Sequence, residues 1–161
     1  MTTPQRPEIK TLANLEAAFA GESMAHIKYR YFAKLAREMG DEDTARAFEA
    51  TADQEVAHAF GHLDLLYPKA TMTPAKALQI AIAGETYEYS EMYPGFRATA
   101  EAEGQAAAVA EMDEQIAESK AHAAEFKAML EKAQKRFAAL ARVEERHAQH
   151  YQAQLDKVQA A

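Results

Sequence analysis

Two pairs of side chains in the sequence have the spacing of metal ligands. Glu55 is followed three residues later by His58, and Glu144 is followed three residues later by His147. On a helix, a spacing of three puts both side chains on one face, where a carboxylate and an imidazole can bind the same ion. Either pair alone is weak evidence, because Glu-x-x-His also arises by chance on solvated helix faces.

Further carboxylates lie in segments whose neighbours are apolar. Glu22 lies between Phe19 and Ile27, and Glu85 and Glu88 follow directly after an apolar run. A carboxylate in such a core-facing position is costly to bury unless a cation compensates its charge. A Glu from each of two helices, with Glu-x-x-His from each of two others, is the ligand pattern of ferritin-like di-metal proteins. The sequence therefore predicts a two-metal site with the ligands Glu22, Glu55, His58, Glu85, Glu88, Glu144 and His147.

Long helices are needed to hold ligands at these spacings, and the sequence around them has helical character. Apolar positions recur at helical spacing, and Gly40 and Gly104 are placed where glycine commonly ends a helix. Asp41 or Asp43 can cap the second helix, and Thr73 can cap the third. The expected helices cover about residues 8–39, 41–67, 74–92, 96–103 and 105–161, with a break or kink at 93–95.

The composition is that of an all-α protein. The 161 residues, 48% of them apolar, can bury a core of their own, and six Gly and five Pro allow few tight turns. Without cysteine there can be no disulfide, thiolate nucleophile, iron–sulfur cluster or zinc ribbon. The net charge of −7 argues against a nucleic-acid or anionic-membrane partner. No apolar run is typical of a signal peptide or a membrane span. We therefore expect a cytoplasmic protein, with a disordered lead-in at residues 1–7 and one domain at residues 8–161.

Four segments of the sequence resemble the motifs of rubrerythrins. They are Gly21-Glu22-Ser-Met-Ala, Ala52-Asp-Gln-Glu55-Val-Ala-His58, Gly84-Glu85-Thr-Tyr-Glu88 with Met92-Tyr-Pro94, and Val143-Glu144-Glu-Arg-His147. The resemblance spans about residues 12–155 and implies a ferritin-like four-helix bundle. It also implies a non-haem di-iron peroxidase that reduces hydrogen peroxide to water.

The resemblance further implies a role for each predicted ligand. The carboxylates that bridge the irons would be Glu55 and Glu144. The terminal ligands would be Glu22, Glu85 and His147. The two ligands exchanged as one iron moves would be Glu88 and His58. Two tyrosines match tyrosines beside the family's site, Tyr29 and Tyr93, although core packing explains each equally well. Carboxylate and imidazole ligands suit manganese as well as iron.

The sequence departs from many rubrerythrins because it contains no cysteine-rich rubredoxin domain. Electrons would then come from an external donor, such as a rubredoxin-like protein. A di-iron bundle without that domain could also be a ferroxidase or another iron-handling protein. A metal-free structural helical bundle is a further alternative.

The position of the fourth ligand pair depends on where the last helical hairpin turns. A turn at Gly104 would place Glu118 or His122, rather than Glu144, beside Glu88. The motif match favours the more C-terminal pair, which requires a turn near residue 116.

The connection at residues 67–73 is short for a ferritin-like bundle. In one chain it would have to return along the bundle, over about 30 Å, which is more than so few residues comfortably span. We therefore expect a homodimer in which the first two helices of one chain pair with the last two of the other, a domain swap.

Overall fold

The computed structural model describes residues 10–159 of the chain, and all its regular elements are helical. The elements are α1 (Thr11–Glu38), α2 (Glu42–Leu66), α3 (Pro74–Tyr87), the π-helical turn η1 (Glu88–Met92), α4 (Tyr93–Ala102) and α5 (Ala106–Gln159). The all-α prediction is confirmed, whereas the expected lead-in at 1–7 lies outside the described residues. Among these helices none is both long and apolar enough to cross a membrane.

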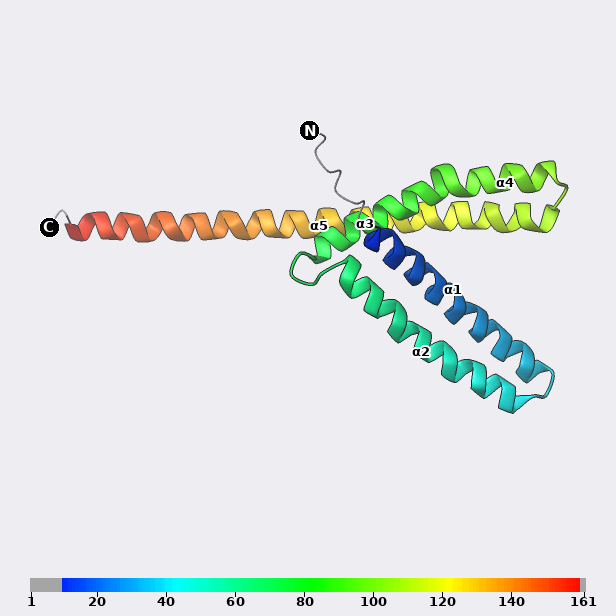
Figure 1. Ribbon diagram of the computed structural model, residues 1–161. Coiled ribbons are helices and arrows are strands. Elements are labelled where there is room, and N and C mark those ends of the chain that lie inside the picture. Colours follow the sequence, from blue (N-terminus) through cyan, green and yellow to red (C-terminus); the bar gives the residue numbers. More distant parts are fainter. Residues whose placement is uncertain (1–9, 160–161) are drawn as a thin grey trace, which may run out of the picture. The chain divides into compact units, whose positions relative to one another are not determined.

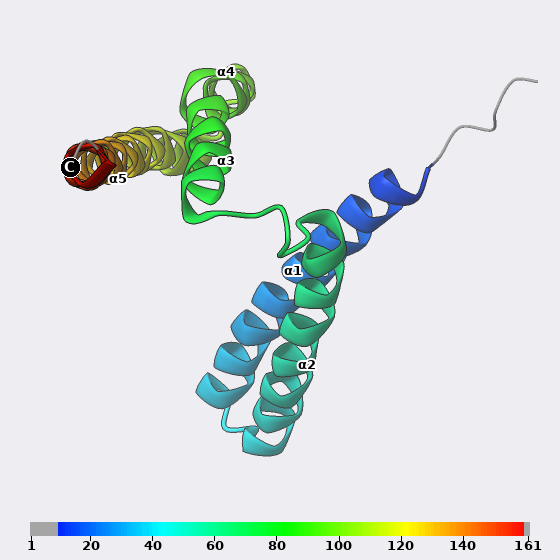
Figure 2. The same ribbon diagram turned by 90° about the vertical axis from the view of Figure 1, so that its left-hand side faces the viewer.

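The chain divides into two compact units, Met1–Met72 and Thr73–Ala161. The first contains α1 and α2, and the second contains α3, η1, α4 and α5. Each unit is a helical hairpin in its own right (Figures 1 and 2). A single domain over 8–161 and a domain-swapped dimer both stay predictions.

The first hairpin turns where the sequence predicts it. Gly40 has a positive φ of 85°, which a residue without a side chain adopts at little cost. Its N–H donates to the Arg37 carbonyl at 3.0 Å, and the Asp41 N–H donates to the Ala36 carbonyl at 2.9 Å. The Asp41 carboxylate then accepts from the Thr44 N–H at 3.0 Å and caps α2.

Small side chains form the seam between α1 and α2. The buried residues of this hairpin are Ala33, Ala45, Ala52 and Ala59. Three of them recur on α2 at intervals of seven, which keeps them on one face along the helix. Alanine lets two helix backbones approach closely, so the polar side chains that flank this seam are also brought close together.

The second hairpin begins as predicted but does not break at residues 93–95. The Thr73 hydroxyl accepts from the Lys76 N–H at 3.1 Å, and Pro74 occupies the first turn of α3. Of the expected break or kink, a break is excluded, because the helical run continues through η1 into α4. In η1 the Tyr93 N–H donates to the Glu88 carbonyl, five residues back. Pro94 therefore falls in the first turn of α4, where its missing N–H is tolerated.

The turn of the second hairpin is at Gly104, and the expected turn near residue 116 is wrong. Gly104 has a positive φ of 71°, and the Gln105 N–H donates to the Ala100 carbonyl at 2.8 Å. No glycine or proline follows, so α5 is continuous from Ala106 to Gln159. The first part of α5 packs on α4, η1 and α3, with Ala100, Ser119 and Ala123 buried between them. The rest of α5 extends beyond the start of α3 (Figure 1).

Candidate metal centre

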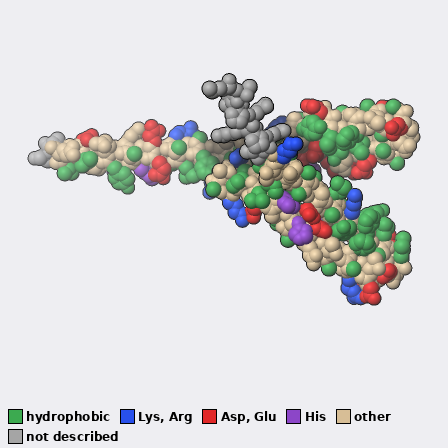
Figure 3. Space-filling view, in the orientation of Figure 1, with side chains coloured by type: hydrophobic (Ala, Val, Ile, Leu, Met, Phe, Trp, Pro, Cys, Tyr) green, Lys and Arg blue, Asp and Glu red, His purple; other side chains and the backbone are tan. Residues whose placement is uncertain are grey.

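Three of the predicted ligands come together on the first hairpin. One ligand atom from each of Glu22, Glu55 and His58 can be chosen so that all three lie within 4.8 Å of one another. The Nδ1 atom of His58 is 3.0 Å from Oε2 of Glu55 and 3.7 Å from Oε2 of Glu22. Figure 3 shows histidine beside acidic side chains on this hairpin. Two carboxylates and an imidazole at these distances can together bind one divalent cation.

The alanine seam positions this cluster. Ala52 is fully buried, and Glu55 and His58 follow it by one and two helical turns. The ring N–H of His26 on α1 donates to the Ala52 carbonyl at 2.8 Å and ties α1 to α2 beside the cluster. As a result, Glu22 and Glu55 are held with their side chains only 29% and 15% exposed.

The two carboxyl groups of this cluster behave as a pair. The pKa of Glu22 is raised, first by a hydrogen bond with Glu55, then by burial and by the negative charge of Glu55. The pKa of Glu55 is lowered by the hydrogen bond with Glu22, and further by a hydrogen bond with His58. The two carboxyl groups are therefore close enough for their charges to interact, and a cation bound between them would offset their repulsion.

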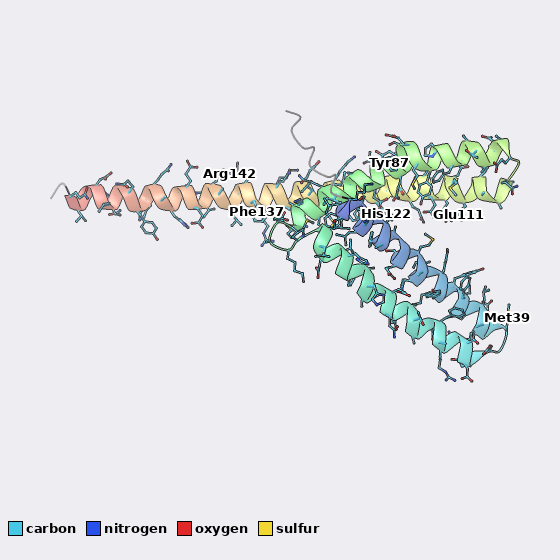
Figure 4. The ribbon with its side chains drawn as sticks, viewed as in Figure 1. Met39, Tyr87, Glu111, His122, Phe137 and Arg142 are labelled. Atoms are coloured by element: carbon cyan, nitrogen blue, oxygen red, sulfur yellow. The ribbon has the colours of Figure 1, made fainter. Side chains whose placement is uncertain are left out.

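The second hairpin brings together a different set of polar groups. Oε2 of Glu85 is 3.5 Å from Nδ1 of His122, across the interface between α3 and α5. Within the described part of the chain this oxygen is buried and accepts no hydrogen bond. The hydroxyl of Ser119, which is 3% exposed, donates to Oε2 of Glu88 at 3.0 Å. Figure 4 labels His122 on the part of α5 that packs against α3.

The predicted pair Glu144 and His147 lies elsewhere on α5. The pair is 3.6 Å apart, and the two side chains are 75% and 59% exposed. From His122 to His147 the helix rises about 37 Å, at about 1.5 Å per residue. Within the second hairpin, Glu144 and His147 therefore do not lie beside Glu85 or Glu88. The role of Glu144 and His147 as metal ligands stays a prediction from the motif.

The two predicted tyrosines have different surroundings. The ring of Tyr29 packs on Phe48, with 5.7 Å between ring centroids. The pKa of Tyr93 is raised by burial and then by the negative charges of Glu88 and Glu85, so its phenol lies close to the acidic groups of the second hairpin.

Sequence reasoning missed Ser119 and the part played by His26. A serine beside an exposed lysine gives no signal of its own, since its contact with Glu88 spans 31 residues of sequence. His26 lies four residues after Glu22 and could be recognised as near the ligand face, but its bond to a carbonyl of the other helix could not.

Comparison with known proteins relates the chain to one family. A family model described as rubrerythrin matches residues 13–70. Nigerythrin from Nitratidesulfovibrio vulgaris is 43% identical over 111 residues, which cover 62% of this chain and 55% of nigerythrin. A solved structure, the fully reduced, all-ferrous state of nigerythrin, is 36% identical and covers 83% of this chain and 73% of that chain, with a TM-score of 0.39. The chain belongs to the rubrerythrin family.

Rubrerythrin from Porphyromonas gingivalis is a further relative, 39% identical over 106 residues, which cover 59% of this chain and 53% of that protein. The chain spans about half the length of the curated relatives it matches. The rubrerythrin family model covers both helices that carry Glu22, Glu55 and His58.

The donor groups of this rubrerythrin-family chain fit a bound metal. Carboxylate oxygens and imidazole nitrogens are the donors that iron and manganese accept in helical di-metal proteins. The convergence of the Glu22 and Glu55 carboxyl groups with His58 and the buried Oε2 of Glu85 are both features that a cation would satisfy.

Proposed function

We propose that this rubrerythrin-family chain binds two iron ions and reduces hydrogen peroxide to water. The observation that carries the proposal is the cluster of Glu22, Glu55 and His58, whose ligand atoms converge within 4.8 Å. The proposed ligands are Glu22, Glu55, His58, Glu85 and Glu88, with a further imidazole from His147 or His122 and its neighbouring carboxylate from Glu144 or Glu118. Manganese could occupy the same donors.

Bound iron would supply the two electrons that, with two protons, convert one hydrogen peroxide into two water molecules. The chain itself must hold the metal, exclude competing ligands and keep protons close by. The raised pKa of Tyr93 keeps its phenol protonated, so that it can donate a hydrogen bond near Glu85 and Glu88. Tyr93, which is not a proposed ligand, is suited to supply a proton during peroxide reduction.

Each turnover requires fresh electrons. The 161 residues include no cysteine, so a rubredoxin-type centre is not part of this sequence. We propose that the donor is a rubredoxin-like centre outside these 161 residues.

Anaerobic stopped-flow oxidation of the iron-loaded protein tests this function. Hydrogen peroxide and oxygen are mixed with the ferrous protein in parallel experiments. Fast and stoichiometric oxidation by peroxide, with a much slower reaction with oxygen, is the expected result. A reaction with oxygen at least as fast as with peroxide would instead indicate a ferroxidase. Glu55→Gln is the inactive reference, and Gln54→Glu, next to it on the exposed side of α2, is its matched control.

A further inference from the structure

The outer part of α5 has an apolar stripe that the rest of the second unit does not cover. α3, η1 and α4 pack on the first part of the helix, and after Ala123 no described side chain of α5 is buried. Phe137, Tyr151 and Val158 are 70%, 72% and 75% exposed. Figure 3 shows hydrophobic side chains gathered along one edge of this part of the helix. An exposed apolar stripe of this length indicates a surface that binds a protein partner.

Helical geometry separates this stripe from the charged side chains. At 3.6 residues per turn, nine apolar side chains from Leu130 to Val158 fall within an arc of about 100° around the helix. The same segment has ten charged residues, and nine of them lie outside this arc. The tenth, Glu144, lies at the middle of the arc. The segment is therefore amphipathic, with a single carboxylate in the centre of its apolar face.

The stripe is nearly symmetrical about Glu144. Phe137 and Tyr151 lie seven residues before and after it, and Leu130 and Val158 lie fourteen residues before and after it. In an antiparallel pair of such helices that cross at Glu144, each aromatic residue faces the aromatic residue on the other side of the centre, and each end of the stripe faces the opposite end. The segment is thus complementary to a reversed copy of itself, which is what a two-fold symmetric interface requires.

We propose that the outer part of α5 binds the same part of α5 in a second copy of this chain, antiparallel and centred on Glu144. Phe137 of each copy then packs on Tyr151 of the other, and Leu140 of each copy packs on Ala148 of the other. The antiparallel orientation also brings opposite ends of the two helix dipoles together, which is favourable. This inference concerns assembly, goes beyond the proposed metal function and needs no bound metal.

The size of the stripe sets the strength of this contact. From Leu130 to Val158 the helix is about 42 Å long, and a helix with its side chains is about 11 Å across. An arc of about 100° on such a cylinder presents about 400 Å², so two copies together bury about 800 Å². That area is at the low end for specific interfaces, so we expect a weak and reversible pairing. The segment has six basic and four acidic side chains, so the repulsion between two copies is small.

Glu144 fixes the register of the pair and weakens it. A carboxylate in the middle of an apolar seam is costly to bury, and two of them meet where the helices cross. Oε2 of Glu144 is 3.6 Å from Nδ1 of His147 in the same chain, and this contact offsets part of the cost. A polar residue at one core position typically specifies the register of paired helices at a cost in stability. An apolar residue in place of Glu144 should therefore strengthen the pairing.

Cysteine cross-linking of the full, metal-free chain tests the pairing, because the 161 residues contain no cysteine of their own. Facing Cα atoms of two packed helices come within the distance of about 7 Å that a disulfide can span. We expect Glu144→Cys to form a covalent dimer with itself. We expect Phe137→Cys and Tyr151→Cys to cross-link only when the two variants are mixed, because the two copies of residue 137 lie about 21 Å apart along the pair.

Arg142→Cys is the control for this experiment. Figure 4 labels Phe137 and Arg142 on the outer part of α5, and five residues of helix turn Arg142 about 140° away from Phe137, onto the charged side. Arg142→Cys should therefore not cross-link. Self-cross-linking of Phe137→Cys, which a parallel pair would give, would overturn the inference. So would cross-linking of Arg142→Cys as readily as Glu144→Cys, or the absence of the mixed cross-link, since a different surface would then cover the stripe.

The mixed cross-link also measures the strength of the pairing. With Glu144→Leu in both chains, half-maximal cross-linking of Phe137→Cys with Tyr151→Cys should require about tenfold less protein, because leucine replaces a costly carboxylate in the seam. Glu131→Leu, the same change on the exposed charged side, should alter that concentration by less than about twofold.

Equal effects of Glu144→Leu and Glu131→Leu would contradict the central position of Glu144. Because all these measurements use metal-free protein, their failure would leave iron binding and peroxide reduction untouched. Conversely, an iron-loaded protein without a peroxidase reaction would contradict the proposed function and leave the pairing of α5 intact.

Discussion

Replacing Ala52 with leucine tests whether the alanine seam of the first hairpin positions the metal ligands. Ala52 is 0% exposed, and its backbone carbonyl accepts from His26 on the facing helix. A leucine adds three carbon atoms where no space is left, so the helices must separate or the side chain must adopt a strained rotamer. Overpacking of this kind costs about 1–3 kcal/mol. For a chain of this size, that corresponds to a fall of about 2–12 °C in the thermal midpoint.

Thermal unfolding followed by circular dichroism measures this effect, with Ala50→Leu as the matched control. Ala50 lies on the exposed face of the same helix, and alanine and leucine have similar helix propensity. We expect Ala50→Leu to unfold within about 1 °C of the parent protein, and Ala52→Leu to unfold earlier and bind cobalt more weakly. Equal midpoints for the two variants would refute the close packing of α1 on α2.

Three further predictions concern acid stability, tyrosine ionisation and assembly. Hydrogen bonds from Arg37 lower the pKa of Glu42 and of Glu49 below the ordinary value of 4.5. The unfolded chain then binds more protons in acid, so this contribution to stability is present above about pH 4.5 and is lost as the pH falls through the lowered values. The stability difference between the parent and Arg37→Gln should therefore shrink on acidification. Burial and the charge of Glu88 raise the pKa of Tyr93 above the ordinary value of 10.0. When the tyrosinate absorbance of Tyr93→Phe is subtracted from that of the parent protein, the remaining signal should therefore titrate above pH 10. Sedimentation of the iron-loaded protein should give the mass of two chains, as expected for a swapped dimer.

Each of these predictions has a contradicting result. Parallel acid-unfolding curves for the parent protein and Arg37→Gln would show that the ion pairs do not contribute in this pH range. A phenol pKa of 10 or below for Tyr93 in the difference titration would contradict the placement of Tyr93 beside the acidic groups. A monomer with both irons bound would exclude the swap.

Local signals in the sequence predicted the elements well. Gly40 with Asp41, and Thr73 with Pro74, act through their own backbone geometry and their nearest neighbours, so their roles can be inferred without the fold. The sequence does not distinguish a break from a kink at Tyr93-Pro94-Gly95, because the π-turn that moves Pro94 into the first turn of α4 leaves no clear pattern in the sequence.

The candidate site was predictable only in part, because its second half depends on a register set by the turn. Glu22, Glu55 and His58 were predicted from motif and spacing, and the first hairpin brings them together. The motif match of Glu144 and His147 outweighed the turn signal of Gly104, and this placed the turn near residue 116. The contact between Ser119 and Glu88 follows from the register of α5 on η1, which no local pattern encodes.

The most direct test of the account is the stoichiometry of ferrous iron binding. Metal-free protein is titrated anaerobically with ferrous iron, and the bound ions are counted and examined by Mössbauer spectroscopy, in parallel with Glu22→Gln and Glu55→Gln. The account predicts two bound ferrous ions per set of ligands in the parent protein, and loss of at least one in each variant. Absence of stoichiometric iron in the parent protein, or binding unaffected by both substitutions, would contradict the central claim that these carboxylates form a di-iron centre.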